Sequence, residues 1–418
     1  MNNHQFVLPG SYKKWTLILL IVGLLTIVYG FFSLDATAHG GHGQNVGATR
    51  FWAVLLQNSV YWLLLVNASM FFICVTTMAM GGWQIALRRV PEAISSVVPV
   101  LGLITFIILL CIVLGHRTDI YHWLDAEAVA KDKILKAKSA FLSPTFYIVW
   151  SAISIGLWSL LGRKMRKMSL DTDKNGTMDY ETGKAWIWKN TVWASLYTVF
   201  FGLTVASTIP WLWLMSIDAH WYSTMYSWYV FASTFVSGMS LVAIYIIYLR
   251  GKGQLEYVTD EHLHDIGKFM FAFSVFWTYL WFSQYMLIWY SNQPEETRYF
   301  VDRIGTAEKS GPFHGIFFLN LVLNFLGPLL ILMKKATKKS WTVVTLTAIM
   351  IIFGHWIDVF QMVMPGTLHG HAELGFFEFG SAAFFIGVIM WGVGRYISKN
   401  SLLAKNHPFM KESIIHHT

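Results

Sequence analysis

Residues 15–34 read WTLILLIVGLLTIVYGFFSL, a run of twenty residues without a charged side chain. A helix of about 20 apolar residues is long enough to cross the hydrocarbon core of a bilayer. Similar runs recur along the chain, and we expect about ten membrane-spanning helices. Their approximate ranges are 15–34, 51–80, 94–114, 145–162, 191–216, 226–250, 268–291, 313–333, 341–364 and 375–396. The sequence therefore predicts an all-α, polytopic integral membrane protein.

The overall composition points the same way. Of the 418 residues, 55% are hydrophobic and only 13% are charged, whereas soluble domains carry about 25% charged residues. A soluble enzyme, a nucleic-acid-binding protein and a disordered scaffold are thereby excluded. The first ten residues are polar and the first apolar run is long enough to span, so no cleaved secretory signal is expected.

The distribution of Lys and Arg predicts the orientation. If the spans alternate in direction, 22 of the 31 basic residues fall in one set of connections and 9 in the other. Cytoplasmic connections are enriched in Lys and Arg. We therefore expect both termini to be cytoplasmic. The net charge of +8 is then a topology signal, with no nucleic-acid partner implied.

The ten spans suggest one membrane domain, 1–418, made of two four-helix bundles and two flanking helices. The predicted parts are a flanking helix with an outer loop (15–50), the first bundle (51–216), the second bundle (217–364), a second flanking helix (365–396) and a cytoplasmic tail (397–418).

Cysteine usage argues against a redox cofactor bound by this chain. Cys74 and Cys111 both lie in apolar runs, and the sequence contains no CxxC or CxxCH motif. Iron–sulfur clusters and covalently attached haem depend on such cysteines. His355 is the only deeply placed histidine, so an intramembrane haem held by two histidines is not expected either, and no metal site is predicted.

Ionisable and amide side chains recur at a similar depth in three consecutive spans. His355 and Asp358 are three residues apart and share a helix face, as do Asn320 and Asn324, and Gln284 lies in the preceding span. At about 1.5 Å per residue, all five lie roughly 10–18 Å inside the outer boundary. Such a cluster could relay protons or bind a quinone carbonyl. The alternative is a hydrogen-bonded network that only specifies helix packing.

Three further residues near the outer face extend this hypothesis. Asp218 and His220 form a titratable pair between the fifth and sixth spans, and Glu378 lies about one turn inside the tenth. They could collect or release protons. The Trp and Tyr residues around Asp218 also fit an ordinary interfacial aromatic belt.

Metal-binding patterns elsewhere are weak. The short motifs His39-Gly-Gly-His42 and His369-Gly-His371 lack a matched fourth ligand. Residues 171–182 match much of a calcium loop, but Thr182 stands where a bidentate Glu is needed. A solvated turn is the alternative interpretation of that segment.

Three motifs resemble those of a known family. They are DAHWYST at 218–224, FSQYMLIWYSNQPEET at 282–297 and GHWIDVF at 354–360. Together with ten spans, they resemble the NrfD/polysulfide-reductase-type membrane subunits of bacterial alternative complex III, most closely the shorter of its two paralogues, quinone-binding subunit 2. The resemblance covers about residues 15–396.

This resemblance implies a subunit of a quinol:cytochrome c or quinol:oxidase oxidoreductase in the bacterial inner (cytoplasmic) membrane. The implied partners are lipids, a paralogous membrane subunit, an iron–sulfur subunit, cytochrome c subunits and a terminal oxidase. Iron–sulfur clusters and haems c would lie in those partners, leaving a quinone or quinol as the ligand for this chain.

The resemblance also bears on individual residues. In the family, polar residues of the bundles are associated with quinol binding or a proton route. That role transfers to Asp218, His220, Gln284, His355 and Asp358, which stand in matching motifs. Asn320, Asn324 and Glu378 rest on depth alone.

The first predicted bundle contains only Gln57, Asn58 and Asn67 as deep polar residues on the second span. We therefore expect this chain to conduct protons and support assembly while its paralogue oxidises quinol. A proton-coupled secondary transporter and a purely structural membrane anchor remain the rival functions.

Overall fold

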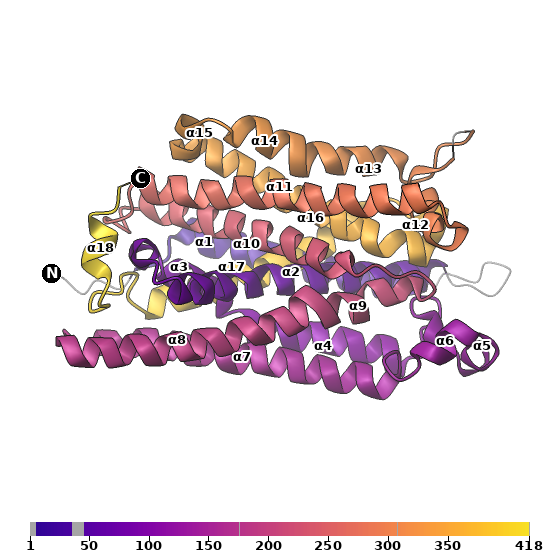
Figure 1. The fold of residues 1–418 in the computed structure, drawn as a ribbon, viewed down its shortest axis with the longest axis horizontal. Coiled ribbons are helices and arrows are strands. Elements are labelled where there is room, and N and C mark those ends of the chain that lie inside the picture. The colour runs from indigo at the N-terminus through magenta and orange to yellow at the C-terminus, as the bar shows by residue number, and fades with distance from the viewer. Residues whose placement is uncertain (1–5, 36–45, 175, 307, 418) are drawn as a thin grey trace.

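The computed structural model describes residues 6–35, 46–174, 176–306 and 308–417 (Figure 1). Over these ranges the chain is helical and contains no β-strand, only an isolated antiparallel bridge between Gly305 and Ser310. The α-helices are α1 Gly10–Gly30, α2 Val46–Met78, α3 Arg89–Ser95, α4 Val98–Leu114, α5 Ala126–Lys131, α6 Lys133–Lys138, α7 Pro144–Lys174, α8 Tyr180–Leu203, α9 Ile209–Trp213, α10 Met225–Gly251, α11 Asp260–Ser291, α12 Pro294–Ile304, α13 His314–Leu321, α14 Gly327–Leu332, α15 Lys335–Lys339, α16 Trp341–Leu368, α17 Phe376–Lys399 and α18 Met410–Ile414. Short 3₁₀ and π segments are η1 Phe31–Asp35, η2 Gly82–Ala86, η3 His122–Leu124, η4 Thr204–Thr208, η5 Met215–Asp218, η6 Val322–Leu326 and η7 His369–His371.

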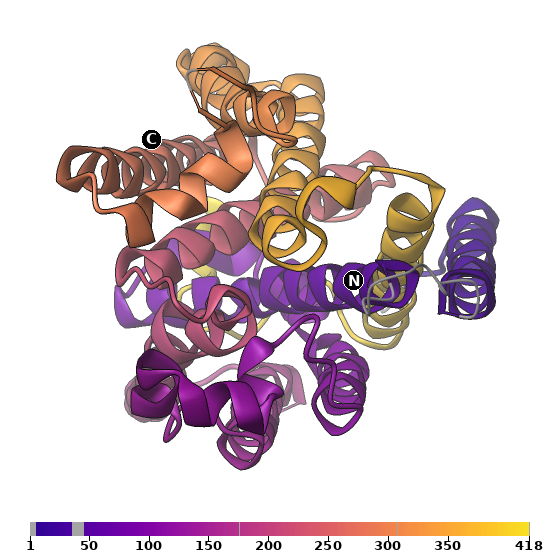
Figure 2. The same ribbon diagram turned by 90° about the vertical axis from the view of Figure 1, so that its right-hand side faces the viewer.

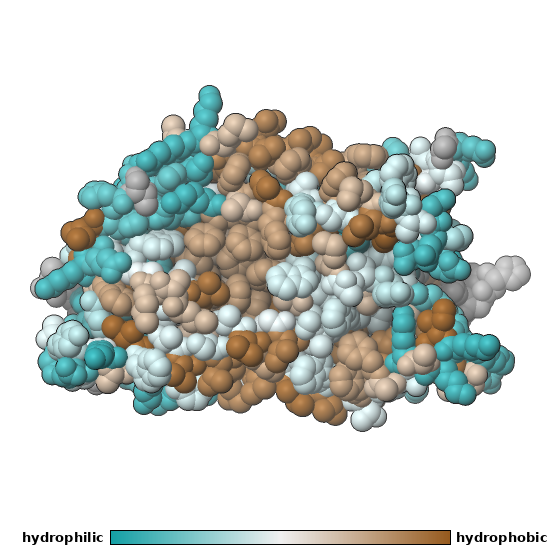
Figure 3. Space-filling view, viewed as in Figure 1, coloured by the Kyte–Doolittle hydropathy of each residue, from teal (hydrophilic) through white to brown (hydrophobic). Residues whose placement is uncertain are grey.

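The predicted all-α membrane class is confirmed. Nine helical segments among the described residues are long and apolar enough to cross a membrane. Apolar side chains form a broad middle band, and hydrophilic ones gather at both ends (Figure 3). The seventh expected span, 268–291, lies in the 32-residue α11, which is not one of the nine. Its many Trp and Tyr side chains are only partly apolar, which lowers its hydropathy.

The long helices form two groups around α2. In the first group, α2 contacts α4 and α8, and α7 contacts the same two helices. In the second, α10 contacts α11 and α16, and α14 contacts the same two helices. Because α2 also contacts α10 and α16, it joins the groups, which lie on opposite sides of it in Figure 2.

The first and last long helices, α1 and α17, pack against each other at the edge of the molecule, where α17 also contacts α2 and α3 (Figure 2). Gly380, Gly387 and Gly394 are spaced seven residues apart on α17 and face α1. A Cβ atom at Gly380 would lie 2.4 Å from Thr26, and one at Gly387 would lie 2.9 Å from the backbone nitrogen of Leu20. Small residues of this kind allow membrane helices to approach closely.

The two ends of the molecule differ in composition. The start of α1 lies at the same end as α3, α15 and α18, which we name the α18 end, and the opposite end holds α5, α6 and α12 and is named the α12 end (Figure 1). The basic residues predicted to be cytoplasmic belong to the α18 end. Examples are those in the first turn of α1, beside α3 and in α15.

Two helical segments contain a π turn that ends two residues before a proline. Segment η4 precedes Pro210, and η6 precedes Pro328. Proline lacks an N–H group and its ring crowds the carbonyl four residues earlier, so a widened turn relieves the crowding. Segment η6 matters for the site because it contains Asn324.

The close approach of α1 and α17 yields a stability prediction. A Cβ atom at Gly23 would lie 2.3 Å from the backbone nitrogen of Phe384. Gly23→Val should therefore force the helices apart and cost about 1–3 kcal/mol, measured as a lower melting temperature in detergent. Gly202→Val is the control, because a Cβ there meets nothing within 4 Å. Equal melting temperatures for the two variants would contradict this account of the pair.

Candidate functional site

The second group of helices encloses a buried carboxylate. Asp358 lies in the middle of α16 with its side chain 1% exposed. Its Oδ1 accepts hydrogen bonds from the Tyr229 hydroxyl and, at 2.8 Å, from Nδ2 of Asn320. Its Oδ2 accepts from Nε1 of Trp277 at 3.0 Å. The two oxygens thus act as acceptors for donors from α10, α11 and α13.

His355 lies beside this carboxylate, one turn earlier on α16. Its Nδ1 is 3.7 Å from Oδ2 of Asp358, and its side chain is fully buried. Neither ring nitrogen has a hydrogen-bond partner among the described residues. The ring packs edge-on against Trp277, with centroids 5.2 Å apart. Because an imidazole nitrogen can accept a proton, His355 is the candidate proton carrier beside the Asp358 carboxylate.

The π turn η6 places a second amide beside the first. Asn324 donates through Nδ2 to Oδ1 of Asn320, and Nδ2 of Asn320 donates to Asp358. Gly354 makes room for this amide, because a Cβ there would lie 2.2 Å from Oδ1 of Asn324. We name the set of Tyr229, Trp277, Asn320, Asn324, His355 and Asp358 the Asp358 network.

A buried arginine connects the neighbourhood of this network to the α12 end. Gln361 lies three residues after Asp358, and its carbonyl accepts from Nε of Arg303 at 3.2 Å. Arg303, on α12, also donates to the carbonyl of Tyr299 at 2.6 Å, and its Nη2 is 3.9 Å from Oδ2 of Asp218. Its guanidinium lies over the Tyr299 ring, 3.4 Å from the centroid. Arg303 thus contacts α16 on one side and η5 on the other.

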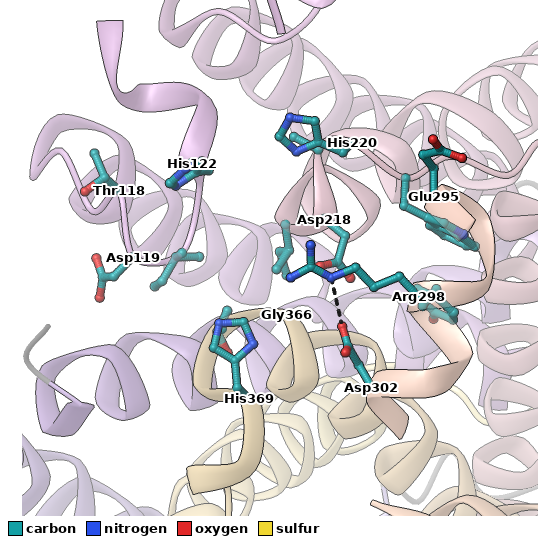
Figure 4. Close-up of a pocket in the computed structure, with 16 residues that line it drawn as sticks. Thr118, Asp119, His122, Asp218, His220, Glu295, Arg298, Asp302, Gly366 and His369 are labelled. Carbon is teal, nitrogen blue, oxygen red and sulfur yellow. Dashed lines mark ion pairs between the residues drawn. The ribbon is translucent and has the colours of Figure 1, made fainter. Parts of the chain in front are cut away.

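Asp218 forms part of the wall of an open cleft of about 350 Å³ at the α12 end. The titratable side chains that line it come from the 118–122 turn, from η5 and the residues after it, from α12 and from η7 (Figure 4). They are Asp119, His122, Asp218, His220, Glu295, Arg298, Asp302 and His369. Arg298 pairs with Asp302 at 3.7 Å. The cleft is therefore a polar, water-accessible region next to the buried Arg303.

The electrostatics of the cleft are governed by burial and by Arg303. Burial raises the pKa of Asp218 above its ordinary value of 3.8, and the positive charge of Arg303 opposes that rise. The Asp218 side chain is 32% exposed, so water reaches it. Burial also raises the pKa of Tyr299 to about 12, which keeps its hydroxyl protonated near neutral pH.

The structure brings together four of the eight predicted site residues. Asp218 is connected to their neighbourhood by Arg303, which contacts both Asp218 and the backbone carbonyl of Gln361. His355, Asp358, Asn320 and Asn324 belong to one network. Gln284 instead accepts from Ser223 Oγ at 3.2 Å and lies outside it.

The other two predicted residues have different partners. His220 is 53% exposed, and its Nε2 lies 2.5 Å from Oδ2 of Asp132, whose pKa it lowers. Glu378 pairs with Arg50 at 2.8 Å and accepts from the Gly375 N–H at 2.9 Å. The Glu378 contacts are those of a helix cap combined with an ion pair.

Four residues of the site were not predicted: Tyr229, Trp277, Arg303 and Gln361. Gln361 offered a signal, since it lies one turn after Asp358 on the same face. Tyr299 and Arg303 are four residues apart on the strongly amphipathic α12, which indicates one inward face. The two aromatic residues offered no signal that separates them from ordinary membrane packing.

The deep amides of the first bundle all have partners that tie helices together. Gln57 donates to the Trp356 carbonyl at 3.2 Å, and Asn58 accepts from Nε1 of Trp356 at 2.8 Å. Asn67 accepts from the Tyr197 hydroxyl at 2.6 Å. Among the described residues, Gln57 Oε1 and Asn67 Nδ2 are nevertheless buried without a hydrogen-bond partner.

The weak metal motifs gain no support. Among the described residues, no group of three or more His, Cys, Asp or Glu is placed to hold a metal ion. His39, His42 and Asn175 lie outside those residues. In the calcium-like segment, Asp171 and Asp173 lie on helix α7, and Asp173 accepts from Arg89 at 2.6 Å. A calcium loop would need irregular backbone where the chain is helical.

An apolar cavity of about 700 Å³ lies between α1, α2, α10, α16 and α17. Its walls include Trp62, Tyr245, Tyr248, Trp356 and Phe379. Nε1 of Trp62 and the hydroxyl of Tyr248 are buried without a protein partner in the described part of the chain. By the helical period, this cavity and the Asp358 network lie on opposite faces of α16.

Comparison of the chain with protein-family models gives no match, and comparison with curated proteins gives none either.

The contact between Asp218 and Arg303 predicts a pH response. Asp218 should titrate above its ordinary pKa, and Arg303→Met should move the midpoint higher still, because the charge that opposes the rise is lost. The infrared C=O band of the protonated carboxyl measures this midpoint, and Asp218→Asn identifies the band.

The raised pKa of Asp218 also makes the stability of the folded protein depend on pH. Between the unfolded and the raised folded pKa, the folded chain binds more protons, so the stability that Asp218 contributes falls as pH rises through that interval. A midpoint that falls or stays constant in Arg303→Met would refute the assignment.

Proposed function

We propose that this chain is a proton-handling membrane subunit of a respiratory quinol:cytochrome c or quinol:oxidase oxidoreductase of the alternative complex III type. The proposal includes ten spans, two four-helix bundles and cytoplasmic termini in a bacterial inner membrane. The contacts within each helix group and the basic α18 end support that arrangement. Electrons would travel through partner subunits that hold iron–sulfur clusters and haems c.

One observation carries the proposal: a carboxylate and an imidazole, 3.7 Å apart, are buried in the helix pack. Each such group is costly in a membrane, and intramembrane Asp and His residues often mark proton routes. Packing alone does not require an ionisable imidazole beside the carboxylate, because Tyr229, Trp277 and Asn320 already donate to its oxygens. Neither nitrogen of His355 has a hydrogen-bond partner within the described residues.

The residues of this chain suggest how a proton would move. His355 would take up a proton on a ring nitrogen, and the Asp358 carboxylate would stabilise the resulting cation. Tyr229, Asn320 and Trp277 hold the carboxylate in place by donating to it. Toward the α12 end, Gln361 and Arg303 lead to Asp218, whose carboxyl would exchange protons with water in the cleft.

A quinone, as substrate, would fit the apolar cavity better than the cleft. Ligand pockets are mostly apolar, of about 300–1,000 Å³, with a few polar groups that orient the ligand. Trp62 and Tyr248 would supply donors to a quinone carbonyl. Because α16 separates this cavity from the Asp358 network, we assign proton transfer rather than quinol oxidation as the role of the network.

Asp358→Asn tests the proton route. The amide has the shape of the carboxylate but cannot hold a negative charge opposite a protonated His355. Quinol-dependent turnover or proton translocation by the assembled complex should fall about tenfold or more. Asp171→Asn, at an exposed ion pair of the α18 end, is the matched control.

A second variant separates chemistry from packing. Tyr229→Phe removes one donor to Asp358 and leaves the carboxylate, so it should shift the pH profile of turnover. Normal turnover and translocation in Asp358→Asn, with an intact complex, would end the proton-route proposal.

Extraction in mild detergent distinguishes the proposed subunit from a proton-coupled transporter. Subunits that bear haem and iron–sulfur clusters should copurify with the chain, whereas the isolated chain should show no Soret band. Purification as a lone monomer or homodimer would favour the transporter, and a Soret band on the isolated chain would contradict the cofactor assignment.

A further inference from the structure

A small cavity at the α18 end is lined in part by four polar side chains, each of which has an atom without a protein partner. The cavity measures about 10 Å³ and lies between the end of α2, η2, α8 and the C-terminal tail. Gln84, Arg88, Asn190 and His407 line it, and their exposures are 1%, 1%, 1% and 6%. Within the described ranges, one side-chain polar atom of each lacks a hydrogen bond: Gln84 Oε1, Arg88 Nη2, Asn190 Oδ1 and His407 Nε2.

The donor or acceptor character of each atom is fixed by its chemistry and its neighbours. Arg88 Nη2 can only donate, and the two amide oxygens can only accept. His407 Nδ1 accepts from the Phe409 N–H at 3.2 Å. Burial and the nearby charges of Arg88 and Arg89 lower the pKa of His407, so the ring is neutral. The remaining proton therefore lies on Nε2, which is a donor.

The side chains that line the cavity thus include two donors and two acceptors without a protein partner. We propose that it binds a single water molecule, which accepts from Arg88 and His407 and donates to Gln84 and Asn190. A buried water makes two to four hydrogen bonds and needs roughly 10–15 Å³, and this site offers four partners in about that space. An anion would face the two carbonyl oxygens and a cation would face the guanidinium, so a neutral molecule fits best.

This water would satisfy the remaining nitrogen of Arg88 and would link distant parts of the chain. The other nitrogens of Arg88 donate to Glu92 at 3.0 Å and to Thr77 at 3.3 Å, so the water satisfies the remaining one. It joins η2 and α8 to residue 407 of the tail. The water is a structural ligand, and its site is independent of the proposed proton route.

The direct test is a density map of the full-length chain in a lipid nanodisc, at a resolution that shows ordered water. One spherical peak should lie about 2.7–3.2 Å from all four atoms. A cavity without a peak, or elongated density from a lipid or detergent, would overturn the proposal.

A double-mutant cycle gives an independent test. Gln84→Met and Asn190→Leu should each lower the melting temperature by a few degrees. The double variant should melt close to the lower single variant, because the first change already disrupts the shared water. In the structure neither oxygen accepts from the other amide, so this non-additivity would indicate a shared donor between them. Lys411→Met, at an exposed tail position, is the control, and additive effects would count against the water.

Discussion

The hydrogen bonding of one buried carboxylate determines how the second group of helices is assembled. An ionisable side chain within a membrane is tolerated when neighbouring groups satisfy its oxygens. Asp358 receives its donors from Tyr229 on α10, Trp277 on α11 and Asn320 on α13. Each helix must therefore present one particular side chain at one depth. The same contact that fixes the packing of these helices also places His355 within reach of the carboxylate.

Helix geometry explains why part of this arrangement could be predicted from the sequence. Apolar runs of sufficient length identify spans, and residues three or four apart share a face. Those two rules place His355 beside Asp358 and Asn320 beside Asn324. They also give matching depths for the two helices when counted from the outer boundary. The predicted membrane class is confirmed, and these four residues do lie together.

Features that depend on tertiary packing could not be predicted in this way. Arg303 belongs to a segment read as an outer loop, and it becomes buried only because α12 folds back over α16. Glu378 has the expected depth, but its position in the first turn of α17 makes it a cap and a partner of Arg50. Asp171 and Asp173 have the spacing of the first two ligands of a calcium loop, but the backbone at both positions is part of helix α7.

The pairing of α1 with α17 has a consequence for biosynthesis. A ribosome releases α1 long before its main partner, α17. Until then the glycine-lined face of α17 is missing, and α1 must remain in lipid without its main partner, which its uncharged apolar run allows. Closure of the structure is therefore a late event. A chain cut short before residue 376 would insert most of its helices and still expose the unpaired α1 to membrane proteases.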